Sequence, residues 1–348
     1  MKRVLLILLA LCVLVGGWYW QRYQQFADTP LTGISADASL VVARGDNLGK
    51  VLQTLKAQNI QTGDRLLWQL LAKQTGAAGK LQVGEYALAV DTSPRTLLIA
   101  MRDGKVVRRK FTIVEGWNIR DLRAALRKVP LLKHTTEQLS DAELMAALGH
   151  AGQHPEGRFL PETYAWVRGD SDLDLLKRAY AAMEKALAAA WAKRAEDLPL
   201  QNEDALLTLA SIVEKETGVA DERPQIAGVF ERRLNIGMRL QTDPTVVYGL
   251  GSRYTGNIRK VDLTTDTPYN TYTRAGLPPT PIAMPGNAAL LAAAQPAKGD
   301  ALYFVAVGDG SGRHVFSKSL DEHNGAVRAY LQRYRAQRSA QREGVANQ

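Results

Sequence analysis

Three consecutive charged residues, Glu214-Lys215-Glu216, follow an apolar helical pattern that begins at Asn202, a residue type that suits a helix N-cap. Successive residues of a helix are about 100° apart, so with Val213 at the centre of the apolar face, Glu216 falls within about 60° of it. Glu214 falls near the margin of that face and Lys215 on the polar side. The pattern therefore predicts three different environments for three adjacent charges.

Burial in an apolar face disfavours the charged form of a carboxyl. Glu216 also lies in the last helical turn, because Gly218 is a natural C-terminal stop, and the negative end of the helix dipole acts in the same direction. Both effects predict a protonated Glu216 near neutral pH, the state that a general acid needs to protonate a glycosidic oxygen. A buried glutamate satisfied by a backbone or arginine partner fits the same position equally well.

The segment after this helix is rich in tyrosine and in polar turns. Residues 241–245, QTDPT, have the composition of a polar turn, and four tyrosines fall within 25 residues, at 248, 254, 269 and 272. Aromatic rings stack on the apolar faces of sugars while neighbouring amides and hydroxyls bind sugar hydroxyls. This composition favours a sugar-chain surface, although tyrosine in proline-rich loops also serves packing.

The first apolar run predicts a membrane anchor. The chain has 348 residues and a net charge of +9, and Val4 to Trp20 contains no charge. Seventeen residues rise about 25 Å as a helix, the short end of what spans a bilayer. Lys2 and Arg3 precede the run, which orients the N-terminus to the cytoplasm and the rest of the chain to the periplasm of a bacterial inner membrane. A cleaved signal peptide is the alternative, disfavoured by the bulky residues that follow Gly17.

Other chemistries find little support in the sequence. Cys12, the only cysteine, lies within the apolar run, which excludes disulfides and thiol nucleophiles from the remaining chain. The five histidines form no metal-ligand pair of the His-Glu-x-x-His kind, and Ser311 lacks the strand-to-helix elbow of a serine hydrolase. We expect neither a metal nor a cofactor, and no nucleic-acid partner, because the positive charge is concentrated at the chain ends.

The pattern of helices and strands predicts an α+β fold in which helices dominate after residue 125. The sequence predicts a strand at 39–43, a turn at 44–48 that caps a helix to about residue 58, a second helix at 64–74 and a strand at 81–86. The strand, glycine turn and helix recur near Gly116, and residues 302–317 are predicted to form a β-hairpin with a glycine-rich loop. The first copy, Gly45-Asp46-Asn47-Leu48, resembles a LysM-type module, a small fold that binds polymers containing N-acetylglucosamine. We expect a stub and anchor at 1–25, a linker at 26–37, a LysM-like subdomain at 38–115, a catalytic domain at 116–335 and a basic tail at 336–348.

Several separated motifs together resemble the endolytic murein transglycosylase family, known as MltG or YceG-like. They are PEG at 155–157, PETY at 161–164, ASIVEKET at 210–217, RLQTDPTV at 239–246, YNTY at 269–272, GLPP at 276–279 and PG at 285–286. The family's catalytic acid is the second glutamate of its Glu-Lys-Glu-Thr motif, which falls on Glu216. We expect substrate-binding residues at Gln241, Asp243, Thr245, Tyr248, Tyr269, Asn270, Tyr272 and Glu162.

The resemblance implies cleavage of peptidoglycan between N-acetylmuramic acid and N-acetylglucosamine. Glu216 would protonate the leaving oxygen and then deprotonate the C6 hydroxyl of the muramic acid, which closes on C1 as a 1,6-anhydro end. Cell-wall synthases and elongation or division proteins are the expected partners. Two alternatives remain: a muramidase that hydrolyses the same bond with Asp243 or Glu162 as its second carboxylate, and a non-catalytic glycan-binding scaffold.

Overall fold

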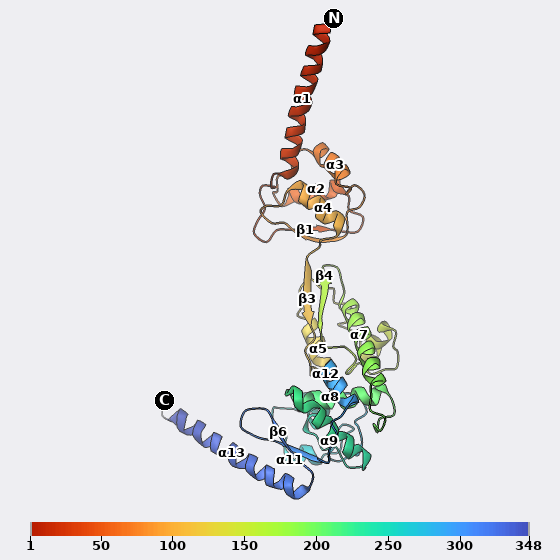
Figure 1. The fold of residues 1–348 in the computed structure, drawn as a ribbon, viewed down its shortest axis with the longest axis vertical. Helices are drawn as coiled ribbons and strands as arrows, with labels where there is room; N and C mark the ends of the chain where they lie inside the picture. Colours follow the sequence, from red (N-terminus) through yellow and green to blue (C-terminus); the bar gives the residue numbers. More distant parts are fainter. Residues whose placement is uncertain (1, 347–348) are drawn as a thin grey trace. The chain divides into compact units, whose positions relative to one another are not determined.

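A computed structural model describes residues 2–346 as a mixed α+β protein, which confirms the expected fold class (Figure 1). The chain divides into two compact units. The first comprises Met1–Lys110 and Ala165–Asp170, and the second Phe111–Tyr164 and Ser171–Gln348. The chain passes from one unit to the other along β3 (Arg108–Thr112) and again along β4 (Thr163–Val167), which form a two-stranded sheet.

The first unit contains a strand, two helices and a second strand in the order that the sequence predicts. Its further elements are α1 (Lys2–Asp28), β1 (Ser39–Val42), α2 (Leu48–Ala57), α3 (Arg65–Gln74), β2 (Gly84–Ala87) and α4 (Pro94–Asp103). β1 and β2 pair antiparallel, with Leu40 opposite Tyr86. Asn47 caps α2 by accepting a hydrogen bond from the Lys50 N–H at 3.1 Å, the role that its place in the glycine turn predicts.

Helix α1 is long and apolar enough to cross a membrane over Leu6–Asp28 by length and composition. It also continues into the folded unit without a break. Ala27 and Leu31 are buried in the core of this unit, and Phe26 meets Trp68 of α3 edge to face at 5.8 Å between ring centroids. Asp28 pairs with Arg95 of α4 at 2.7 Å. Residues 26–31, expected within a linker, therefore belong to the packed body of this unit.

The second unit is mainly helical, with one hairpin. Its helices are α5 (Ile119–Leu126), α6 (Asp141–Leu148), α7 (Asp172–Ala192), α8 (Glu203–Glu216), α9 (Arg223–Asn235), α10 (Asp243–Leu250), α11 (Lys260–Thr264), α12 (Asn287–Ala294) and α13 (Leu320–Ala346), with single 3₁₀ turns at Ala220–Glu222 and Gly251–Arg253. Strands β5 (Tyr303–Ala306) and β6 (His314–Ser317) pair antiparallel, as the sequence predicts.

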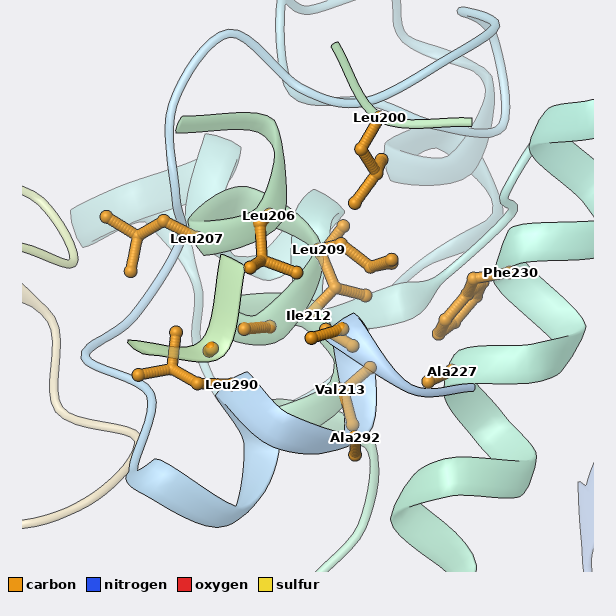
Figure 2. Close-up of a cluster of buried hydrophobic side chains, with 14 of the residues drawn as sticks. Leu200, Leu206, Leu207, Leu209, Ile212, Val213, Ala227, Phe230, Leu290 and Ala292 are labelled. Atoms are coloured by element: carbon orange, nitrogen blue, oxygen red, sulfur yellow. The ribbon is translucent and has the colours of Figure 1, made fainter. Parts of the chain in front are cut away.

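Helix α8 is at the centre of this unit. Asn202 caps it through a 2.9 Å hydrogen bond from the Ala205 N–H, and Glu203 and Asp204 favour the positive end of its dipole. Figure 2 shows Leu209 and Val213 of α8 beside Phe230 of α9, with side chains of α12 on another flank. Because apolar neighbours cover α8 on several sides, its last turn is fixed in position.

One further segment, at 241–245, differs from the sequence expectation. The turn expected at 241–245 is the start of α10, because Asp243 and Pro244 occupy the first helical positions, where an acid favours the dipole and proline lacks only an N–H that has no helical partner. The tail expected at 336–348 continues α13 as far as Ala346, and residues 347 and 348 lie outside the described residues.

Two N-terminal deletions should distinguish the residues of the proposed anchor from those that contribute to the core of the first unit. A chain lacking residues 1–25 keeps Phe26, Ala27 and Leu31, so it should fold and be soluble. A chain lacking residues 1–31 loses all three, and removal of comparable core side chains costs about 2–5 kcal/mol. We expect a clearly lower midpoint of urea unfolding for the longer deletion, followed by circular dichroism. Equal midpoints would show that residues 26–31 do not contribute to the core.

Candidate active site

The last turn of α8 gives its two glutamates different surroundings. Glu216, the last helical residue, is partly buried, and its Oε1 accepts a hydrogen bond from the Thr242 hydroxyl. Burial raises the pKa of Glu216 to about 7; the Thr242 hydrogen bond opposes this rise, and the charge of Asp243 adds to it. Glu216 can therefore both give up and take up a proton near neutral pH.

Glu214 is tied to the backbone. Its Oε2 accepts the Gly286 N–H at 3.0 Å, and burial raises its pKa, an effect that the Gly286 bond offsets and the nearby Glu115 increases. A Cβ at residue 286 would lie 1.9 Å from Glu115 Oε1, so a larger residue there would displace the Glu115 side chain. Lys215 is exposed and donates to the Gly116 carbonyl at 3.2 Å. Of the three adjacent charges, Glu216 alone lines the cavity described next.

A cavity of about 420 Å³, here called the acid hollow, opens beside Glu216. It is lined by Glu216, Arg233, Leu240, Gln241, Thr242, Asp243, Tyr272, Tyr303, Phe304, Val305, Leu320, His323 and Val327. Gln241 has a φ of 48°, an unusual conformation for a residue other than glycine. Such backbone strain concentrates at functional sites.

A second cavity of about 440 Å³, here called the tyrosine hollow, shares Asp243 with the first. Its other lining residues include Asn118, Arg120, Lys215, Tyr248 and Tyr254. Tyr272 donates its hydroxyl proton to Asp243 Oδ1 at 2.6 Å, and so fixes the carboxylate common to both hollows. Two adjoining hollows with a shared acidic wall suit a chain-like ligand better than a compact one.

Arg233 places a buried positive charge in the wall of the acid hollow. Its guanidinium donates to the carbonyls of Leu302 at 2.7 Å and Leu240 at 2.6 Å. Burial lowers the pKa of Arg233, and the charge of Glu216 raises it again. The same interaction lowers the pKa of Glu216, so Arg233 stabilises the ionised carboxylate.

The structure places the residues expected to bind substrate in three groups. Gln241, Asp243 and Tyr272 line the acid hollow, and Tyr248 lines the tyrosine hollow. Tyr269 lies against Tyr248, at 4.8 Å between ring centroids, and its hydroxyl is within 2.9 Å of Thr280 Oγ1. The others lie elsewhere.

Thr245 and Asn270 are buried, and their side chains form hydrogen bonds within the protein. Thr245 Oγ1 bonds the Thr242 carbonyl at 2.7 Å, and Asn270 Nδ2 bonds the Thr265 carbonyl at 2.7 Å. They hold the polar loops in shape. Glu162 is exposed and lines neither hollow.

The sequence analysis did not single out Glu156. Its side chain is fully buried, accepts the Ile119 N–H at the start of α5 at 3.1 Å and accepts the Tyr248 hydroxyl at 2.9 Å. Burial raises its pKa to about 7, and the hydrogen bonds from Ile119 and Tyr248 oppose that rise. The PEG motif at 155–157 was the available signal, but no local pattern identifies partners 37 and 92 residues away.

A buried glutamate also holds His314 of β6. Glu222, in the turn between α8 and α9, accepts the His314 N–H at 3.0 Å, and its Oε2 lies 2.9 Å from His314 Nδ1. A charged His314 ring would lower the pKa of Glu216. Among the residues that the structure describes, no group of three histidine, cysteine or acidic side chains is placed to hold a metal ion.

Known proteins are similar to this chain in fold and in sequence. The endolytic murein transglycosylase of Bacillus subtilis is 29% identical over 307 residues, which cover 83% of this chain and 84% of the relative. That of Streptococcus pneumoniae is 28% identical over 361 residues, 94% of this chain and 64% of the relative. A crystal structure of a yceG-like protein from Listeria monocytogenes has a TM-score of 0.52 and 28% identity, and covers 84% of this chain and 99% of that one.

A model of the YceG-like family matches residues 40–329, which include every lining residue of both hollows. This match confirms the resemblance drawn from the separated sequence motifs. The protein is a member of the YceG-like family.

Proposed function

We propose that this protein is an endolytic murein transglycosylase, as its relatives are named, and that Glu216 is its catalytic acid and base. The observation that carries the proposal is a carboxyl with a pKa of about 7 in the wall of a cavity that adjoins a second, tyrosine-lined cavity. Endolytic cleavage needs room for sugars on both sides of the cut bond. The two hollows, which meet at Asp243, supply such room.

Glu216 would act twice. Protonated, it donates to the glycosidic oxygen between N-acetylmuramic acid and N-acetylglucosamine; as a carboxylate, it then takes the proton of the muramic acid C6 hydroxyl, whose oxygen closes on C1. The leaving sugar keeps the first proton, so no water is consumed and Glu216 ends protonated. Desolvation favours its acid form, and Thr242 and Arg233 favour its base form.

A hydrolase is the second candidate, because Asp243 lines the same hollow as Glu216. A muramidase uses a second carboxylate to activate water or to attack the sugar. We favour the transglycosylase, in which Asp243, held by the Tyr272 hydroxyl, raises the pKa of Glu216 and contacts sugar hydroxyls.

We also propose that α1 anchors the protein in the bacterial inner membrane as a single pass, with a cytoplasmic N-terminus and a periplasmic catalytic domain at 116–335. Its apolar length and the preceding Lys2 and Arg3 support this topology. The order β1-α2-α3-β2 supports a LysM-type module within 38–115 that binds glycan. Cell-wall synthases and elongation or division proteins are the proposed partners.

Replacing Glu216 by Gln should abolish cleavage of purified murein. Gln keeps the shape and can still accept the Thr242 hydrogen bond, but it has no proton to give. General acid–base catalysis contributes about 10²–10⁴-fold, so the loss should be at least of that size. Glu214→Gln is the matched control, because Glu214 lies two residues away and accepts the Gly286 N–H; this variant should keep substantial turnover. Loss of activity in Glu214→Gln alone would identify the other carboxyl as catalytic.

The difference in stability between the wild type and the Glu216→Gln variant should depend on pH. The folded pKa of Glu216, about 7, lies above its ordinary value of 4.5, so ionisation destabilises the folded wild type as pH rises from 4.5 through 7. Glu216→Gln removes this effect. Its melting temperature should therefore exceed that of the wild type at pH 8, and the difference should disappear near pH 4. A constant difference would show that burial does not control this carboxyl.

The products distinguish the transglycosylase from the hydrolase. Mass spectrometry of murein digested by the wild type should find 1,6-anhydro-muramic ends, which are lighter by one water than reducing ends. Reducing ends would establish hydrolysis and assign Asp243 the role of second carboxylate. Binding of glycan strands by both the wild type and Glu216→Gln, without products from either, would establish the scaffold.

Tyr248→Phe should separate the roles of ring and hydroxyl. The ring remains in the tyrosine hollow, but buried Glu156 loses a donor, which costs about 1–3 kcal/mol of folding stability. That hydrogen bond lowers the pKa of Glu156, so it favours the ionised form, and the loss should be larger at pH 8 than at pH 6. Urea unfolding at both pH values measures it. Tyr248→Ala should in addition raise KM for glycan strands; an unchanged KM would exclude the ring from binding.

A further inference from the structure

Helix α3 presents two leucines to solvent on the flank of the first unit. Leu66 is 65% exposed and Leu70 is 55% exposed, although Trp68 and Leu71 of the same helix are buried in the core. Around the helix axis, Lys73 lies within about 20° of Leu66. The exposed face of α3 is therefore apolar with a basic border, as in helices that lie at a membrane surface.

Leu70 of this face adjoins α1 in the folded unit, and Leu66, Leu70 and Lys73 also line a cavity of about 570 Å³ beside the turn at 46–48. A crevice of about 510 Å³ is lined by Tyr19 and Trp20 of α1 and by Leu67 and Leu70 of α3. The Tyr23 hydroxyl donates to Gln74, the last residue of α3, and Phe26 packs on Trp68. These contacts fix the position of α3 along α1. The depth of α1 in a bilayer therefore sets the depth of α3.

The aromatic residues of α1 indicate its depth in the bilayer. Gly16 and Trp20 both line the crevice, and the four residues between their positions rise about 6 Å along α1. This rise matches the thickness of the polar layer of one leaflet, about 5–8 Å. Tyr and Trp at the end of an apolar span lie in that layer. Leu70, which shares the crevice with Tyr19 and Trp20, then lies at the same depth.

We propose that the exposed face of α3, Leu66 and Leu70 with Lys73, inserts into the headgroup layer of the leaflet from which α1 emerges. The inference rests on the proposed membrane anchoring by α1. The occupant is phospholipid, because α1 continues without a break from the bilayer into the core of the unit. The exposed face of α3 is therefore held at the depth of the lipid headgroups. Lys73 would extend its ammonium group to lipid phosphates while its methylenes remain among apolar groups.

The test uses the full chain in vesicles of phosphatidylethanolamine and phosphatidylglycerol. In a Cys12→Ala background, Leu70→Cys and Leu66→Cys carry a bimane label, and some lipids carry a nitroxide quencher near the headgroup. Val83→Cys is the matched control, with 57% exposure next to β2, because the β1–β2 sheet lies on the side of the unit away from the start of α1 (Figure 1). We expect the labels at 66 and 70 to lose most of their fluorescence and the label at 83 to keep it.

Bimane on the native Cys12 reports the anchor itself with lipids quenched deep in the acyl region. Quenching at 12 without quenching at 66 or 70 overturns this inference and leaves the anchor in place. No quenching at 12 overturns the anchor and the inference together. If chitooligosaccharide changes the fluorescence at 66 and 70 while nitroxide lipids do not, glycan occupies this face and the lipid contact is excluded.

Discussion

The packing of one buried helix sets the environment of the carboxyl at its end. Glu216 is the last helical residue of α8, whose preceding turns are covered by the apolar side chains of neighbouring helices. That cover fixes the direction of the carboxyl and removes water from it, and removal of water raises its pKa to about 7. Packing energy and acid strength therefore have a common origin in the core around α8.

The polar residues near the site form a fixed frame. The Thr242 hydroxyl donates to Glu216, and the Tyr272 hydroxyl donates to Asp243. Asn270 Oδ1 accepts the Tyr272 N–H at 2.9 Å and so holds the loop that carries Tyr272. Side chains fixed in this way need little reorganisation when charge moves during a reaction. The frame also explains why several residues of the sequence motifs are buried rather than exposed to a ligand.

The sequence predicted the local features of this arrangement well and the long-range ones poorly. The apolar period of α8 was enough to place Glu216 on its buried side, because a helix has a fixed angle per residue. The β5–β6 hairpin and the cap of α2 were likewise evident from nearby residues. Thr245 and Asn270 were assigned to substrate because polar type alone does not reveal whether a side chain faces a ligand or its own loop.

Glu156 and Glu222 show why the remainder could not be predicted. Glu156 meets Tyr248 across 92 residues, and Glu222 meets His314 across the same separation. Neither pair follows from propensity or period, because both depend on how distant elements pack. Position 243 was similarly ambiguous: Asp-Pro is common in turns, and here it begins a helix.

Helix α8 also restricts how the length of this chain can vary over evolution. Adding or removing one residue between Asn202 and Glu216 would rotate the carboxyl by about 100° and shift it by about 1.5 Å, out of the acid hollow, even if every apolar position were preserved. This segment can therefore tolerate substitutions but not insertions or deletions. The loop before Asn202 and the turns after α10 are free of that restriction, and length differences among relatives should collect there.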